Sequence, residues 1–81
     1  MSKTITILYF AQLAAERGLD SETRTGDGHT ALDWFEEIST EHKLSLPAEL
    51  VRPAVNGSYC AWETLVPDGA TLAFIPPVSG G

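Results

Sequence analysis

The sequence predicts one α+β domain in which a mixed β-sheet is covered on one face by a single main helix. Three features support this prediction: an alternating apolar strand at the start, an amphipathic helix in the middle and several short strands in the last third. The 81 residues suffice for one domain only. A helix laid across one face of a sheet buries the apolar surfaces of both. We therefore expect four to five strands, with residues 1–75 forming the domain.

Residues 4–10 are rich in β-branched and aromatic side chains and alternate in character with a period of two. They predict a strand whose buried face carries Ile5 and Ile7. The seven residues that follow are helix formers, and Gly18 closes this short helix as a C-cap. Residues 21–25 are few and polar, which is typical of a second strand at an edge of the sheet.

The strongest helix signal runs from about Thr30 to Lys43. Thr30 is a good N-cap, and Asp33, three residues later, completes a capping-box pattern. Apolar residues recur on one side of this segment and acidic residues on the other. The predicted apolar stripe consists of Leu32, Trp34, Phe35 and Ile38.

The last third of the chain predicts a hairpin. Asn56-Gly57 is a strong two-residue hairpin signal, preceded by Ala54-Val55 and followed by a returning strand over residues 58–62. This interpretation places Cys60 on the returning strand as a small core residue.

A final strand is predicted at residues 71–75, after a turn at Asp68-Gly69 where glycine supplies a positive φ. Pro76 and Pro77 end this strand because proline cannot donate to a strand ladder. The expected strand and helix order is ββαβββ, with a flexible tail over residues 76–81.

The charge of the chain excludes one class of function. Eleven acidic and five basic residues give a formal net charge of −6, and the basic residues are scattered. A nucleic-acid-binding protein needs a basic stripe, whereas an acidic surface favours a basic partner. No run approaches the roughly 20 apolar residues of a membrane span, and the first ten residues show no secretory signal. We expect a cytoplasmic protein without nucleic-acid or membrane partners.

The side chains predict no catalysis. Cys60, His29 and His42 are too few for a Cys/His metal cluster, and no nucleophile has an evident base beside it. Glu36 and Glu37 are adjacent and therefore diverge on a helix, which argues against paired-carboxylate chemistry. We expect a non-catalytic protein with no bound cofactor and no metal.

The tail is the feature that points to a function. It ends in Gly80 and Gly81, and its two prolines favour an extended chain. Six residues at about 3.3 Å each reach roughly 20 Å. A tip without side chains suits a carboxylate that must enter a narrow active site of another protein. Because a carboxylate reacts only after a partner activates it, for instance as an acyl-adenylate, the tail predicts a carrier.

The element order and the terminal Gly-Gly resemble those of the ubiquitin-like β-grasp proteins. More narrowly, the whole chain resembles the family of molybdopterin synthase small subunits. The motifs that carry this resemblance are Tyr9-Phe10-Ala11, Ala54-Val55-Asn56, Asp68-Gly69 and Pro76-Pro77-Val78-Ser79-Gly80-Gly81. The chain departs from the pattern at Ala70, where family members usually carry a second aspartate.

The resemblance implies roles for the two terminal glycines and for the tail that carries them. Gly81 would be adenylated by an E1-like enzyme that uses ATP, and a sulfurtransferase would supply the sulfur of a C-terminal thiocarboxylate. Gly80 would be its steric companion. The tail would enter the active site of a large subunit, where two carriers in turn would supply the sulfurs of the molybdopterin dithiolene to cyclic pyranopterin monophosphate. The synthase would be a heterotetramer around a large-subunit dimer.

Other functions share the same features. A sulfur carrier for thiamine, cysteine or tRNA thiolation is one, and a ubiquitin-like modifier joined to lysines is another. A third is a plain interaction domain with an idle tail.

The alternation of the first strand also predicts an apolar patch on the sheet face away from the helix. Leu8 and Phe10, opposite in parity to the buried residues, point outward there. Tyr59 and Ile75 join them from neighbouring strands, and such a patch marks a partner site. The predicted partner-binding residues are Phe10, Tyr59, Ile75, Pro76, Pro77, Val78 and Ser79.

Overall fold

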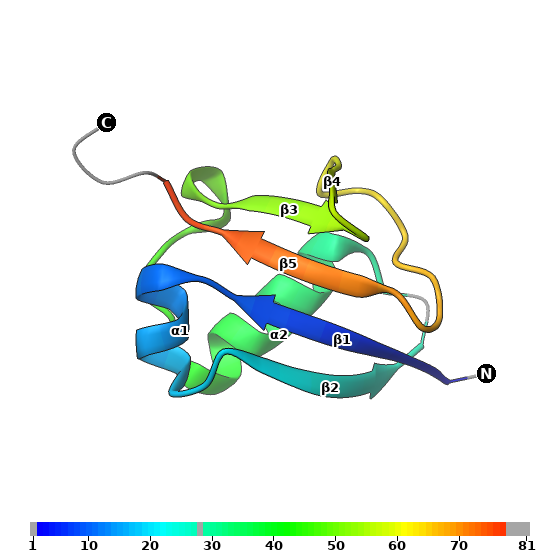
Figure 1. Ribbon diagram of the computed structural model, residues 1–81, viewed down its shortest axis with the longest axis horizontal. Helices are drawn as coiled ribbons and strands as arrows, with labels where there is room; N and C mark the ends of the chain where they lie inside the picture. Colours follow the sequence, from blue (N-terminus) through cyan, green and yellow to red (C-terminus); the bar gives the residue numbers. More distant parts are fainter. Residues whose placement is uncertain (1, 28, 78–81) are drawn as a thin grey trace.

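The computed structural model of the chain describes residues 2–27 and 29–77. These residues form a two-layer α+β fold in which the main helix crosses one face of a five-stranded mixed sheet (Figure 1). The predicted fold class is therefore confirmed. The elements are β1 (Lys3–Tyr9), α1 (Ala11–Arg17), β2 (Ser21–Gly26), α2 (Ala31–His42), the short 3₁₀ helix η1 (Ala48–Leu50), β3 (Arg52–Val55), β4 (Ser58–Tyr59) and β5 (Thr71–Ile75).

The strand order in the sheet is β2-β1-β5-β3-β4. β1 and β5 are parallel neighbours, and the other pairs are antiparallel. Because these two strands run in the same direction, their carboxyl ends meet at one end of the sheet (Figure 1). Phe10 follows β1 at that end, and Pro76 follows β5 beside it. The start of the predicted tail therefore leaves the sheet next to Phe10.

The first third of the chain follows its prediction closely. Ile5 and Ile7 are buried on the helix-facing side of β1. α1 spans the predicted seven residues, and Gly18 caps it with φ 85°. β2 lies at the edge of the sheet, as its polar sequence predicts.

The main helix begins as predicted and ends one residue earlier. The Thr30 hydroxyl accepts from the Asp33 amide at 3.1 Å, and the Asp33 carboxylate accepts from the Thr30 amide at 3.0 Å. Lys43 is the C-cap, in the left-handed region at φ 54°. The predicted apolar stripe is slightly wrong, because Leu32 is only half-buried. The buried face is the i, i+3, i+4, i+7 set Ala31, Trp34, Phe35 and Ile38.

The hairpin turn is confirmed, but its returning strand is shorter than predicted. Asn56 and Gly57 both have positive φ, 51° and 86°, as a type I′ turn requires. β4 then contains only two residues, so Cys60 lies beyond the strand and is half-buried instead of in the core. The chain leaves the sheet because the carbonyls of Trp62 and Thr64 accept from the first amides of α2, at 3.0 and 2.9 Å.

The turn before β5 is hydrogen-bonded to the beginning of β1. The Asp68 carboxylate accepts from the Thr4 amide at 2.7 Å, and the Gly69 amide donates to the Thr4 carbonyl at 2.8 Å. Gly69 has φ 80°, as predicted. Ala70, where the chain departs from the family pattern, is buried and belongs to the core.

The core lies between the sheet and α2 and is rich in aromatic rings. Phe74 is central to it, with the Phe35 ring at 5.1 Å and the rings of Trp62 and Tyr9 at 6.2 Å each. Among the described residues, no helix has both the length and the apolar character needed to cross a membrane.

Candidate functional site

The sheet face opposite α2 carries an apolar patch near the end where β1 and β5 finish. We define the sheet-face patch as Leu8, Phe10, Tyr59 and Ile75. Phe10 is 44% exposed and Tyr59 is 63% exposed, while Leu8 and Ile75 are half-buried. The sequence predicts that all four residues point outward on this face. Phe10 and Tyr59 are exposed as predicted, and Leu8 and Ile75 are exposed in part.

Two alanines form the floor of the sheet-face patch. Leu8 pairs with Ala73, Ala73 with Ala54, and Ala54 with Tyr59, so the four residues form one row across four strands. Ala54 and Ala73 are buried although they lie outside the core cluster. Small residues between larger ones make a shallow groove, and its lining is Leu8, Phe10, Ala54, Gly57, Tyr59, Thr71, Ala73 and Ile75.

A second groove lies at the base of the tail and shares two residues with the patch. Arg52 lies over the Tyr59 ring, with its guanidinium carbon 5.5 Å from the ring centre. Leu50, in η1, is 51% exposed. The groove is lined by Glu49, Leu50, Arg52, Tyr59, Ile75, Pro76 and Pro77.

Sequence reasoning missed Arg52 and Leu50 as site residues. Arg52 could have been found, since it has the same strand parity as Ala54 and faces Ile75 in the sheet register. Leu50 follows from no periodic pattern, because η1 is a single irregular turn.

The structure brings together most of the predicted partner-binding residues. Phe10, Tyr59, Ile75, Pro76 and Pro77 lie at one end of the sheet. The remaining predicted site residues, Val78, Ser79, Gly80 and Gly81, lie outside the described residues.

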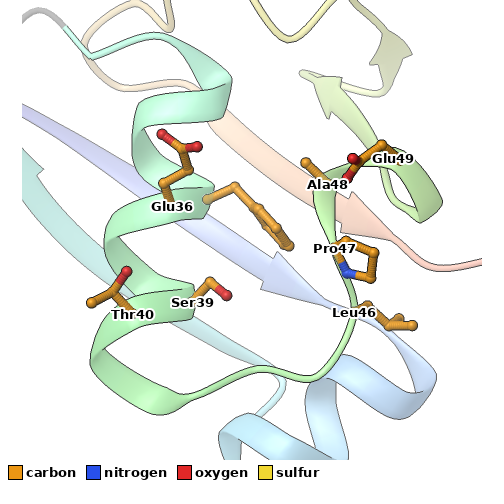
Figure 2. Close-up of a pocket in the computed structure, with 8 residues that line it drawn as sticks. Glu36, Ser39, Thr40, Leu46, Pro47, Ala48 and Glu49 are labelled. Atoms are coloured by element: carbon orange, nitrogen blue, oxygen red, sulfur yellow. The ribbon is translucent and has the colours of Figure 1, made fainter.

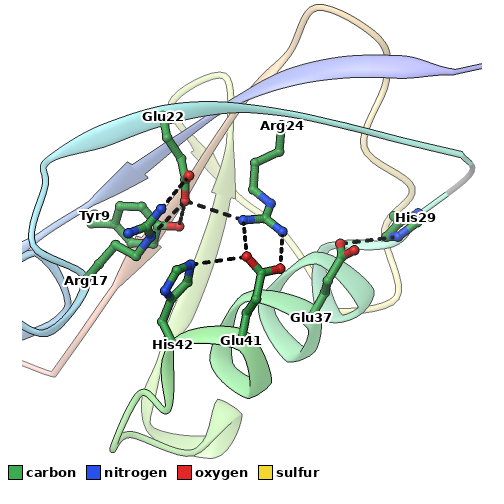
Figure 3. A network of polar contacts seen from close by, with 8 residues as sticks. All are labelled: Tyr9, Arg17, Glu22, Arg24, His29, Glu37, Glu41 and His42. Carbon is green, nitrogen blue, oxygen red and sulfur yellow. Dashed lines mark hydrogen bonds and ion pairs between the residues drawn. The ribbon is translucent and has the colours of Figure 1, made fainter.

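The helix-facing side carries a polar network that the sequence did not reveal (Figure 3). Arg17 donates two hydrogen bonds to the Glu22 carboxylate, at 2.8 and 3.1 Å, and the Tyr9 hydroxyl donates to the same carboxylate. Partial burial acts to raise the pKa of Glu22, but these hydrogen bonds outweigh it and the net shift is downward. Burial, with Glu22 beside it, raises the pKa of Tyr9.

The network continues from β2 to α2. Arg24 donates to the Glu41 carboxylate at 2.7 Å and lies 3.8 Å from Glu22. The hydrogen bond from Arg24 lowers the pKa of Glu41, and His42 Nε2 lies 3.3 Å from Glu41. Figure 3 shows the side chains of Glu22 and Arg24, both in β2, pointing towards α2. These contacts hold the edge strand against the helix.

A further groove lies between α2 and η1 (Figure 2). Glu36, Ser39 and Thr40 come from the helix, and Phe35 contributes apolar surface. The facing wall is the segment from Leu46 to Glu49. The groove holds no histidine or cysteine, and the described part of the chain contains no group of three side chains placed to hold a metal ion.

A helix across a mixed sheet of order β2-β1-β5-β3-β4, in which the first and last strands are parallel neighbours, is the architecture of the ubiquitin-like β-grasp proteins. The profile of the ThiS family matches residues 7–81. The chain therefore belongs to the ThiS family, and its fold is that of the ubiquitin-like sulfur carriers.

Solved structures agree with this assignment. The molybdopterin converting factor subunit 1 from Pyrococcus furiosus, so named only putatively, is 28% identical with a TM-score of 0.78, over 94% of this chain and 99% of that one. SAMP1 from Haloferax volcanii is 25% identical with a TM-score of 0.79, over 96% and 99%. The BexX/CysO complex of Amycolatopsis orientalis contains a chain 25% identical with a TM-score of 0.68, over 95% and 99%. No curated protein sequence matches significantly.

Proposed function

We propose that this protein is the sulfur-carrier small subunit of a molybdopterin synthase. The observation that carries the proposal is the placement of the sheet-face patch beside Pro76, where the segment ending in Gly80-Gly81 leaves the domain. The 28% identity to the molybdopterin converting factor subunit 1 of Pyrococcus furiosus supports this pathway.

The chemistry takes place at the C-terminal carboxylate of Gly81. In an E1-like partner, the carboxylate attacks the α-phosphorus of ATP, and pyrophosphate leaves. A persulfide on a sulfurtransferase then attacks the acyl-adenylate and displaces AMP. A second thiol cleaves the resulting acyl disulfide, which leaves a thiocarboxylate on this chain and a disulfide on the donor. In the large subunit each thiocarboxylate gives one sulfur to cyclic pyranopterin monophosphate, and water restores the carboxylate. Two carriers in turn therefore supply the two dithiolene sulfurs. No side chain of this chain has to act as acid, base or nucleophile in these steps.

Recognition and chemistry use different parts of the molecule. The sheet-face patch supplies apolar surface to the large subunit, with Arg52 and Pro77 at the border nearest the tail. The assembled synthase is a heterotetramer with the large-subunit dimer at its centre. Because each partner must receive the same tail, the activating enzyme also docks near this patch.

The test uses the full chain with the purified large subunit, E1-like adenylyltransferase and sulfurtransferase of the same cell. Deletion of Gly81 removes the residue that is activated, so we expect thiocarboxylate and molybdopterin formation to be abolished while the melting temperature is unchanged. Gly81→Ala should fold equally well and react poorly, because a Cβ beside the reacting carbonyl collides with a channel shaped for glycine. Gly80→Val should react more poorly than Gly80→Ala for the same reason.

Intact mass spectrometry reads the result directly. The wild-type protein should gain the mass difference between sulfur and oxygen, and the deletion variant should not. Molybdopterin formation by the Gly81-deleted protein would contradict the carrier mechanism.

A second candidate is a carrier or modifier that serves another pathway. SAMP1 and a chain of the BexX/CysO complex are each 25% identical to this chain, and the Pyrococcus furiosus protein is 28% identical. Because these identities are similar, they favour the second candidate almost as much as the first. A thiocarboxylated protein that gives no molybdopterin with its large subunit would select another sulfur pathway. High-mass lysine conjugates would select the modifier.

A further inference from the structure

The two edges of the sheet differ in length. β4, at one edge, contains two residues, whereas β2, at the other, contains six and carries no proline. Ser21, Thr23 and Thr25 of β2 are all exposed. A long edge strand presents unpaired backbone groups to which another strand can add.

The register of β2 on β1 determines which backbone groups point outward. The Tyr9 amide donates to the Asp20 carbonyl at 2.8 Å, which marks this pair as a hydrogen-bonded one. Hydrogen-bonded pairs alternate along an antiparallel ladder, so Glu22 and Arg24, opposite Ile7 and Ile5, also bond to β1. The backbone amides and carbonyls of Ser21, Thr23 and Thr25 therefore face away from β1, towards the open edge of the sheet.

The sequence of this edge is complementary to itself. In an antiparallel pair of two β2 strands centred on Thr23, Ser21 of each copy faces Thr25 of the other. Glu22 then faces Arg24 of the second copy, at a non-hydrogen-bonded position where side chains lie closest. Each of these side chains is already ion-paired within its own molecule, Glu22 with Arg17 and Arg24 with Glu41. The pairing therefore places opposite charges, and not like charges, directly across from one another.

We propose that β2 is a self-association edge, on which a second copy of this chain pairs antiparallel about Thr23 to form one sheet across both molecules. The pairing leaves the sheet-face patch and the tail exit free, because they lie on β1, β5, β3 and β4. Each chain carries a net charge of −6. The resulting long-range repulsion makes the dimer weak, and added salt screens that repulsion.

A disulfide trap tests the register. At the two-fold axis the two Thr23 Cα atoms would lie about 5.5 Å apart, within the range that a disulfide spans. Thr23→Cys, in a Cys60→Ser background, should therefore cross-link with itself under mild oxidation.

Thr25→Cys in the same background is the matched control. Its side chain is exposed like that of Thr23 and faces the same way, but its symmetry mate would lie four residues away along the strand, about 13 Å. We expect Thr25→Cys to cross-link at least tenfold more slowly than Thr23→Cys. Equal rates for the two variants, or faster cross-linking of Thr25→Cys, would overturn the proposal.

A second pair of variants tests the backbone pairing without cysteine. Thr23→Pro removes an amide that faces outward and leaves the bonds to β1 intact, since proline is tolerated on edge strands. Thr23→Ala keeps that amide. In sedimentation equilibrium at high protein concentration, the wild type and Thr23→Ala should associate while Thr23→Pro stays monomeric at an unchanged fold by circular dichroism. A monomeric wild type, or association of folded Thr23→Pro, would overturn the proposal.

Discussion

The two faces of the sheet show how one strand can serve stability and recognition at the same time. Phe74 and Ile75 are neighbours in β5, yet Phe74 is fully buried among aromatic rings and Ile75 lines the open grooves. The helix-facing side is packed, and Glu22 and Arg24 on it are ion-paired. The open side keeps apolar side chains half-exposed. A monomer gains little from such exposure, and in the function proposed above this open face is the surface that the large subunit covers.

The faces also differ in how their residues are held. Tyr9, Arg17 and Glu22 hold one another on the helix-facing side through hydrogen bonds. On the open side Phe10 and Tyr59 stand beside small alanines. The hydrogen-bonded side chains on the helix-facing side contribute to the stability of the fold. The exposed side chains on the open side contribute little to it. Substitutions on the two faces should therefore change different measurements.

The largest expected effect is on the packed face. Phe74→Ala should lower the free energy of unfolding by about 3–5 kcal/mol, because it removes a buried ring and leaves a cavity. Ile75→Ala, one residue away, should lower it by less than about 1.5 kcal/mol, since Ile75 is half-exposed. Urea denaturation of both variants measures the difference. Equal losses would show that the two faces contribute alike.

A smaller effect is expected for binding on the open face. Phe10→Arg should weaken the affinity for the large subunit at least tenfold, about 1.4 kcal/mol, because it places a charge in an apolar contact. The melting temperature should stay close to the wild-type value, since Phe10 is 44% exposed. Calorimetric titration measures the affinity, with Thr23→Ala as a control substitution remote from the patch. Unchanged affinity would remove the sheet-face patch from the interface.

The smallest effect is the pH dependence of the polar network. The pKa of Glu22 is lower in the folded protein than the ordinary carboxyl value of about 4.3. Glu22 therefore stabilises the fold above that value, and the contribution is lost as the pH falls through the folded pKa. Glu22→Gln should flatten the decrease in unfolding free energy below about pH 5. Denaturation series at several pH values measure this slope, and an unchanged slope would contradict the assignment.

Local patterns in the sequence determined most of the elements. The alternation of residues 4–10, the capping pair Thr30 and Asp33, and the Asn56-Gly57 turn each depend on neighbouring residues only. Such features form in the same way wherever the segment lies, so the sequence alone predicts them. The parity of β1 was also sufficient to predict that Phe10 faces away from the core.

Contacts between distant segments decided the rest. β4 ends early because the carbonyls of Trp62 and Thr64 bond to the start of α2, which no pattern near Cys60 reveals. Leu50 becomes a site residue only because η1 lies beside the tail exit.

The backbone of the corner after β1 was likewise decided by the tertiary structure. Ala11 has φ 50°, a left-handed conformation that costs alanine about 1–2 kcal/mol. Its sequence, a run of helix formers, predicts no such strain. The sequence by itself thus determined which segments are strands and helices and which side of β1 is buried. Only the packing of β1 against β5 decided that Phe10 and Pro76 lie together, because that pairing joins residues more than 60 positions apart.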